Sequence, residues 1–98
     1  MAAYIVFVRE RVRDAEAFAG YSSLAVPSLA GHPGKPLVYY GGIETLEGPP
    51  AEGLVVVEFP GMAEARAWYD SPAYTAARAK RFASADFRVF ITEGLSAA

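Results

Sequence analysis

The sequence predicts an α+β fold in which four strands and two helical regions follow one another in the order β-α-β-β-α-β. Two apolar runs, residues 3–10 and 54–59, show little of the polar alternation of a half-exposed strand, which is typical of strands covered on both faces. Two other regions carry apolar residues at helical spacing, and clusters of glycine and proline separate the segments. Together these patterns indicate a sheet with helices packed on it.

The first strand and the helix after it have recognisable boundaries. Residues 3–10 are aromatic and β-branched, and Asp14 stands where a helix N-cap belongs, with a carboxylate able to accept from a free N–H of the first turn. Pro27 lacks the backbone N–H that a continuing helix needs, so we expect a break near Val26. The buried face of this helix is expected to hold Phe18, Tyr21 and Ala25.

A hairpin is expected in the middle of the chain. Its first strand should span residues 35–43, with a bulge at the paired glycines Gly41-Gly42. Residues 44–53 then form the connecting loop, and residues 54–59 the second strand.

The second helical region should consist of two helices. The first is expected to pack on the sheet through Met62, Ala65 and Tyr69, which share a helical face. Ser71-Pro72 then combines a capping hydroxyl with a helix-starting proline, so a separate helix begins there. That helix carries Tyr74, Ala77, Arg78 and Arg81, and residues 87–93 form the last strand.

This order of elements is the ferredoxin-like arrangement, a four-stranded antiparallel sheet with helices on one face, in a single domain of residues 1–98. A domain of this size buries only about 60–65% of its unfolded surface and is marginal alone. The bare face of an apolar sheet needs a cover, and a second copy is the simplest one. We therefore expect a homodimer through the sheet face, with clefts between helices and sheet.

Composition excludes several classes of function. The formal net charge is −2 and no run of Lys or Arg is present, so nucleic acid is not an expected partner. Neither an apolar run of about 20 residues nor a secretory signal is visible, which indicates a cytoplasmic protein without a membrane partner. The chain has no Cys and one His, too few for most zinc or copper sites, although carboxylates alone could hold a hard cation. We expect no metal and no cofactor.

Several stretches of the sequence together carry a family resemblance. The most specific stretch is Ala65-Arg66-Ala67-Trp68-Tyr69-Asp70-Ser71-Pro72, and the others are 14–21, 41–42, 57–60, Arg81 and 93–94. In these stretches the chain resembles domain-of-unknown-function family 1330, over nearly its whole length. The resemblance implies a dimeric α/β barrel, in a superfamily that also holds cofactor-free monooxygenases, muconolactone isomerases and relatives of chlorite dismutase. Many members have Arg just before the Gly-Gly pair, where this chain has Tyr40.

Three charged or titratable side chains are candidates for chemistry. His32 titrates near neutral pH and is a candidate general base, although a surface position in its loop is the alternative. Glu58 interrupts an apolar strand, where a carboxylate either has a raised pKa suited to proton transfer or pairs with Arg66, Arg81 or an arginine of a partner subunit. Arg81 could bind a ligand carboxylate, or alternatively neutralise the carbonyls at its helix end.

Aromatic residues are candidates for the walls of a binding site. Trp68, Tyr69 and Tyr74 could line a pocket for a flat apolar ligand, with plain core packing as the alternative. Tyr40 is a further candidate. Because successive strand residues point to opposite faces, Tyr39 and Tyr40 should diverge, and at most one of them should face a given cleft.

Three functions fit these observations. The first is a dimeric protein that binds a small, partly apolar or anionic molecule in the helix–sheet cleft. The second is a cofactor-independent monooxygenase or isomerase in which His32 or Glu58 moves a proton and Arg81 steadies an anion. The third is a non-enzymatic dimeric scaffold. Convergence of these three side chains on one cavity would favour catalysis, and dispersal would favour the scaffold.

Overall fold

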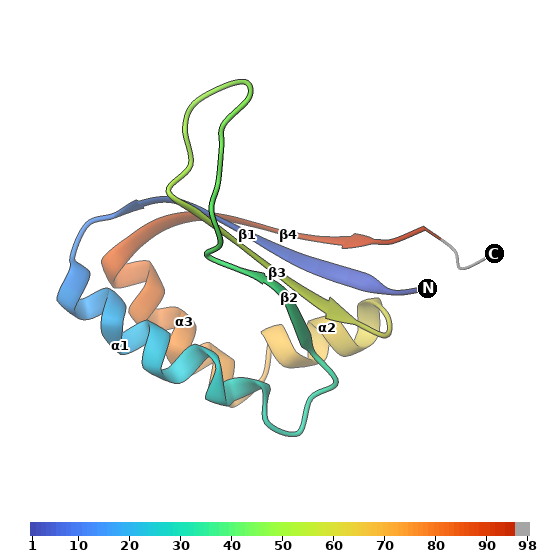
Figure 1. The fold of residues 1–98 in the computed structure, drawn as a ribbon. Helices are drawn as coiled ribbons and strands as arrows, with labels where there is room; N and C mark the ends of the chain where they lie inside the picture. Colours follow the sequence, from blue (N-terminus) through green and yellow to red (C-terminus); the bar gives the residue numbers. More distant parts are fainter. Residues whose placement is uncertain (96–98) are drawn as a thin grey trace.

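The computed structural model describes residues 1–95 and shows an antiparallel sheet of order β2-β3-β1-β4 with three α-helices on one face (Figure 1). The elements are β1 (Ala3–Val12), α1 (Ala15–Ala25), the 3-10 helix η1 (Pro27–Leu29), β2 (Lys35–Tyr39), β3 (Gly53–Phe59), α2 (Met62–Tyr69), α3 (Pro72–Ser84) and β4 (Ala85–Glu93). The predicted ferredoxin-like α+β fold is confirmed. Residues 96–98 of the expected domain lie outside the described part.

The helix boundaries follow from local chemistry. Asp14 caps α1 by accepting a hydrogen bond at 3.0 Å from the backbone N–H of Ala17. Pro27 separates α1 from η1, as expected from its missing N–H. Ser71 caps α3 by accepting from the N–H of Tyr74 at 3.3 Å, and Pro72 occupies the first helical turn.

The two faces of the sheet differ in what covers them. Odd-numbered residues of β1 and β3 face the helices and form the core, which includes Ile5, Phe7, Val57 and Phe59. The other face, called here the bare face, carries apolar side chains as well. In register, Val38 lies opposite Val56, Val56 opposite Val6, and Val6 opposite Phe90. These four residues, the apolar row, cross all four strands.

Two expectations are wrong, one about where a strand ends and one about which side chain of α2 packs on the sheet. The strand expected over 35–43 ends at Tyr39, and its irregularity lies at Leu37, whereas Gly41-Gly42 belong to the loop after it. In α2, Met62 is exposed, and Trp68 is the large side chain that packs on the sheet beside Ala65.

The loop of residues 40–52 projects from the sheet on the side away from the helices (Figure 1). Its ends are tied to the sheet, because the N–H of Tyr40 donates to the carbonyl of Leu54 at 2.9 Å and the N–H of Glu52 to that of Arg9 at 2.8 Å. Within residues 1–95, no helix has the length and hydropathy needed to cross a bilayer.

Candidate functional site

Trp68 is the centre of the aromatic core between helices and sheet. Its ring centroid lies 4.3 Å from that of Tyr74 and 5.6 Å from that of Phe59, and it is 3% exposed. The indole N–H donates to the hydroxyl of Ser28 at 3.1 Å, so the polar end of the buried ring is satisfied. This bond ties α2 to η1 across the core.

A cleft opens beside Trp68, between α1 and η1 on one side and β2 and β3 on the other. We call it the aromatic cleft. Its cavity volume is about 40 Å³, at the base of a wider opening of about 430 Å³ that includes solvent. Its walls include Tyr21, Leu29, Tyr39, Tyr40, Val57 and Trp68. Of the predicted ligand-binding residues, the structure brings Tyr40 and Trp68 together here.

Tyr39 and Tyr40 both line the aromatic cleft, so the expectation that they diverge is wrong. Tyr40 has a φ of +53°, in the left-handed region that residues other than glycine rarely adopt. Side chains alternate between the two faces only while the backbone is extended, and the backbone of Tyr40 is not extended. The two rings therefore meet, with centroids 4.9 Å apart.

Arg9 holds Tyr40 in place from above its ring. The guanidinium carbon lies 4.7 Å from the Tyr40 centroid and 5.5 Å from that of Phe18. Arg9 also pairs with Glu52 at 3.6 Å, at the end of the projecting loop. Burial raises the pKa of Tyr40 to about 12, so its hydroxyl is neutral at physiological pH.

A cluster of buried polar side chains, made of tyrosines and one arginine, lies behind the cleft. The hydroxyls of Tyr21 and Tyr74 are 2.9 Å apart, and burial raises the pKa of each. Tyr74 is fully buried and lines none of the described cavities. Arg81, 2% exposed, donates from Nη2 to the Tyr69 hydroxyl at 3.3 Å.

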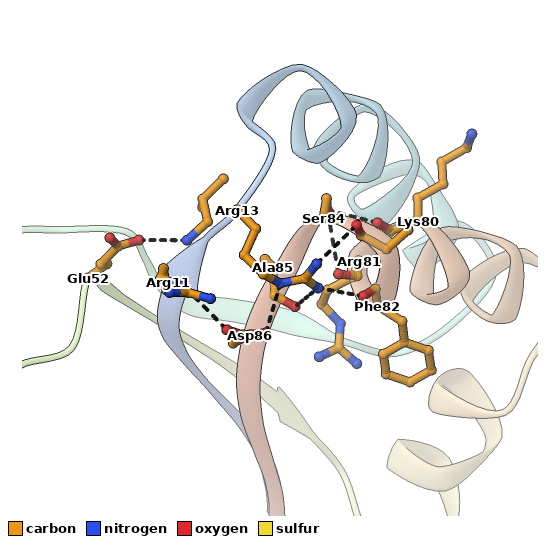
Figure 2. Close-up of polar contacts among 11 residues, drawn as sticks. Arg11, Arg13, Glu52, Lys80, Arg81, Phe82, Ser84, Ala85 and Asp86 are labelled. Atoms are coloured by element: carbon orange, nitrogen blue, oxygen red, sulfur yellow. Dashed lines mark hydrogen bonds and ion pairs between the residues drawn. The ribbon is translucent and has the colours of Figure 1, made fainter.

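The carbonyls at the end of α3 are bound by Arg13 and not by Arg81. Arg13 donates to the carbonyls of Phe82 at 2.7 Å and Ala85 at 3.3 Å, and its Nε to Asp86 at 2.9 Å. Figure 2 shows the Arg81 side chain running away from these groups. Its guanidinium lies instead among the rings of Phe82 at 5.0 Å, Phe87 at 5.1 Å and Phe7 at 5.8 Å.

The three candidates for catalysis do not share a cavity. His32 is half-buried in the loop after η1, and no described cavity is lined by it. Glu58 lies on the bare face, opposite Tyr4 of β1 and Lys35 of β2, whereas Arg81 lies on the helix side of the sheet. Partial burial and the Glu58 carboxylate raise the pKa of Tyr4.

The ion pair expected between Glu58 and Arg66 or Arg81 is not formed. Arg66 pairs with Asp70 at 3.0 Å, one helical turn away, and Arg81 bonds to Tyr69. Within residues 1–95, no three His, Asp or Glu side chains gather as metal ligands.

Sequence reasoning missed three residues that shape the cleft. Tyr21 was expected in the core, and it also lines the cleft. Helical spacing shows that a residue faces the sheet, but it does not distinguish a core position from a cleft wall. Ser28 has a recognisable position after Pro27, but its bond to Trp68 depends on packing between distant segments. Arg9 stands at the end of an apolar strand, and no sequence signal points to its place above Tyr40.

Alkaline titration is expected to ionise the tyrosines in two phases. Burial favours the neutral phenols of Tyr21, Tyr40 and Tyr74, so their stabilising contribution is complete below the unfolded pKa of about 10. It is lost as pH rises through the folded pKa, which is about 12 for Tyr40. Absorbance at 295 nm should therefore show a late phase that coincides with loss of far-ultraviolet circular dichroism.

The variant Tyr40→Phe serves as the control for this titration, because it should remove part of the late phase only. A single ionisation step near pH 10 with unchanged circular dichroism would contradict the burial of these phenols.

A family model described as domain of unknown function (DUF1330) matches residues 2–95. The chain belongs to this family. A solved structure with a similar fold, a protein of unknown function from Rhodopseudomonas palustris, is 24% identical with a TM-score of 0.77, over 98% of this chain and 84% of that one. Among proteins of curated function, none matches the sequence.

Two more distant structures share the fold of this DUF1330 protein. A dimeric protein of unknown function with a ferredoxin-like fold, from Bacteroides fragilis, is 10% identical with a TM-score of 0.67, over 95% of this chain and 96% of that one. SnoaB, a cofactor-independent oxygenase from Streptomyces nogalater, is 8% identical with a TM-score of 0.65, over 98% of this chain and 94% of that one. At these identities the likeness shows the fold alone.

Proposed function

We propose that this DUF1330 protein is a homodimer that binds a small, partly apolar molecule in the aromatic cleft. The observation that carries the proposal is the backbone of Tyr40. A left-handed residue other than glycine costs on the order of 1 kcal/mol, and glycine would avoid this cost. Strain of this kind is concentrated at binding sites, and here it turns a phenol ring into the cleft.

The walls of the cleft define the chemistry of the ligand. Apolar and aromatic side chains dominate these walls, and Tyr39 and Tyr40 are the lining tyrosines whose hydroxyls are not used in the buried pair of Tyr21 and Tyr74. No Asp, Glu, Lys or Arg of the described residues lines this cleft. A neutral aromatic molecule with one or two oxygen atoms matches the chemistry of such walls, since an ion would lose hydration without gaining a counter-charge. Part of such a molecule would lie in the open mouth of the cleft.

The arrangement of charged residues supports binding over catalysis. Because His32, Glu58 and Arg81 lie apart, proton transfer and anion stabilisation have no common centre. An open cleft beside a strained tyrosine, on the other hand, is not needed by a protein that serves only as a scaffold.

The dimer is proposed to form through the bare face. The dimeric state of the B. fragilis structure supports a homodimer. The apolar row gives the bare face four hydrophobic side chains in register, and Val38 and Phe90 are 37% and 48% exposed in the single chain. Covering this row with the same face of a second copy removes it from water and leaves both aromatic clefts accessible.

Binding of 1-naphthol, a neutral aromatic alcohol, tests the proposed site. Trp68 is the only tryptophan of the chain and lines the cleft, so its fluorescence reports on occupancy. We expect 1-naphthol to quench this fluorescence and Tyr40→Gly to weaken binding about tenfold, since an aromatic wall is lost.

The control is Phe82→Ala, which removes an exposed ring outside the cleft and should leave the affinity unchanged. Absence of quenching up to the solubility limit of 1-naphthol, or equal affinity of Tyr40→Gly and wild type, would refute the site.

A further inference from the structure

A second cavity lies between α2 and the β4 side of the sheet and shares no lining residue with the aromatic cleft. We call it the arginine cavity. It holds about 360 Å³ of empty space, part of it open to solvent. Ile5, Val89 and Ile91 form its apolar floor, and Phe90, Arg66 and Tyr69 complete its walls.

Positive charge is concentrated around Tyr69. Arg81 donates to its hydroxyl at 3.3 Å, and the Arg78 guanidinium lies 4.5 Å from its ring centroid. Arg66 lines the same cavity as Tyr69. A single carboxylate, that of Asp70, pairs with Arg66 at 3.0 Å and contacts Arg78 at 3.9 Å. Among the described residues, none supplies a carboxylate to Arg81.

Arg81 is poorly satisfied for a buried cation. It is 2% exposed, and within residues 1–95 its guanidinium donates one hydrogen bond, to Tyr69, while its buried Nε has no acceptor. A buried charge without a counter-ion is costly, and the surrounding aromatic rings offset only part of that cost. An anion bound nearby would supply the missing negative charge.

Tyr69 links the buried Arg81 to the cavity wall by a hydrogen bond. Its oxygen accepts a hydrogen bond from Arg81, so its own O–H remains available to donate elsewhere. A phenol whose oxygen is held by a guanidinium is a stronger donor than a free one, because the hydrogen bonds polarise each other. Tyr69 and Arg66 both line the cavity, so a phenol O–H and a guanidinium belong to the residues of its wall.

We propose that the arginine cavity is a second binding site, which takes a small carboxylate with an apolar skeleton. The carboxylate accepts from the Tyr69 hydroxyl and from Arg66, and the skeleton packs on Ile5, Val89 and Ile91. Arg81 is a positioning residue that acts through Tyr69. The two sites then differ in ligand class, neutral in the aromatic cleft and anionic here.

A nuclear magnetic resonance titration of the full chain with benzoate and with its uncharged analogue benzamide tests this site. We expect benzoate to shift the amide signals of Tyr69, Val89 and Ile91, and benzamide to bind about tenfold more weakly, because it lacks the charge. Tyr69→Phe keeps the ring and should weaken benzoate binding about tenfold. The matched control Tyr4→Phe removes a phenol hydroxyl on the bare face, outside both cavities, and should not change it.

The role of Arg81 is tested by the ratio of the two affinities. Arg81→Met should lower the preference for benzoate over benzamide, a ratio that a purely structural role would leave unchanged. Equal binding of both probes by wild type, shifts confined to other residues, no binding of benzoate, or full affinity in Tyr69→Phe would each overturn the proposal.

Discussion

Val56→Glu is expected to convert the proposed dimer into a monomer. Val56 lies at the centre of the apolar row, between Val38 and Val6, where a second sheet would cover it. Burying an unpaired carboxylate costs several kcal/mol, so the dissociation constant should rise at least about a hundredfold. Sedimentation velocity over a range of protein concentrations measures this directly.

The matched control is Ala79→Glu, which adds the same charge on the exposed surface of α3 and should leave the dimer intact. A Val56→Glu protein that dimerises as tightly as wild type would show that the bare face is not the interface. A loss of dimer in both variants would point instead to general charge repulsion.

Trp68→Ala is expected to lower the free energy of unfolding by about 3–5 kcal/mol. The side chain is 3% exposed and contacts the rings of Phe59, Tyr74 and Phe7, so its removal leaves a large cavity. Small domains are stable by only about 5–15 kcal/mol in total. Urea unfolding followed by circular dichroism at a fixed protein concentration gives the value.

Trp68→Phe separates packing from hydrogen bonding at this position. It keeps an aromatic ring but removes the N–H that donates to Ser28, so a smaller loss of about 1–2 kcal/mol is expected. A loss below about 1 kcal/mol in Trp68→Ala would mean that the core collapses around the missing ring.

Local signals made the helices predictable. Asp14, Pro27 and Ser71-Pro72 act on the backbone next to them, so their effect can be read without knowing the rest of the fold. Helical spacing also placed Arg81 on the same face as Tyr74, and both are buried. The partners of Arg81 come from α2 and β4, and only packing between distant segments reveals them.

The site was harder to predict because it depends on departures from regular geometry. Alternation along a strand assigns Tyr39 and Tyr40 to opposite faces, and the left-handed backbone of Tyr40 reverses that assignment. For Glu58, alternation separates it correctly from Val57 and Phe59. Since both faces of β3 are apolar, the sequence does not say which face meets the helices.

The projecting loop offers a way to observe both proposed events in one molecule. Leu46 is 86% exposed in this loop, and the chain contains no cysteine. Leu46→Cys would therefore introduce a unique thiol for a fluorescent label, on the same side of the sheet as the proposed dimer interface and on the loop that begins at Tyr40. Energy transfer from Trp68 to such a label would follow occupancy of the cleft, and transfer between two labels would follow assembly.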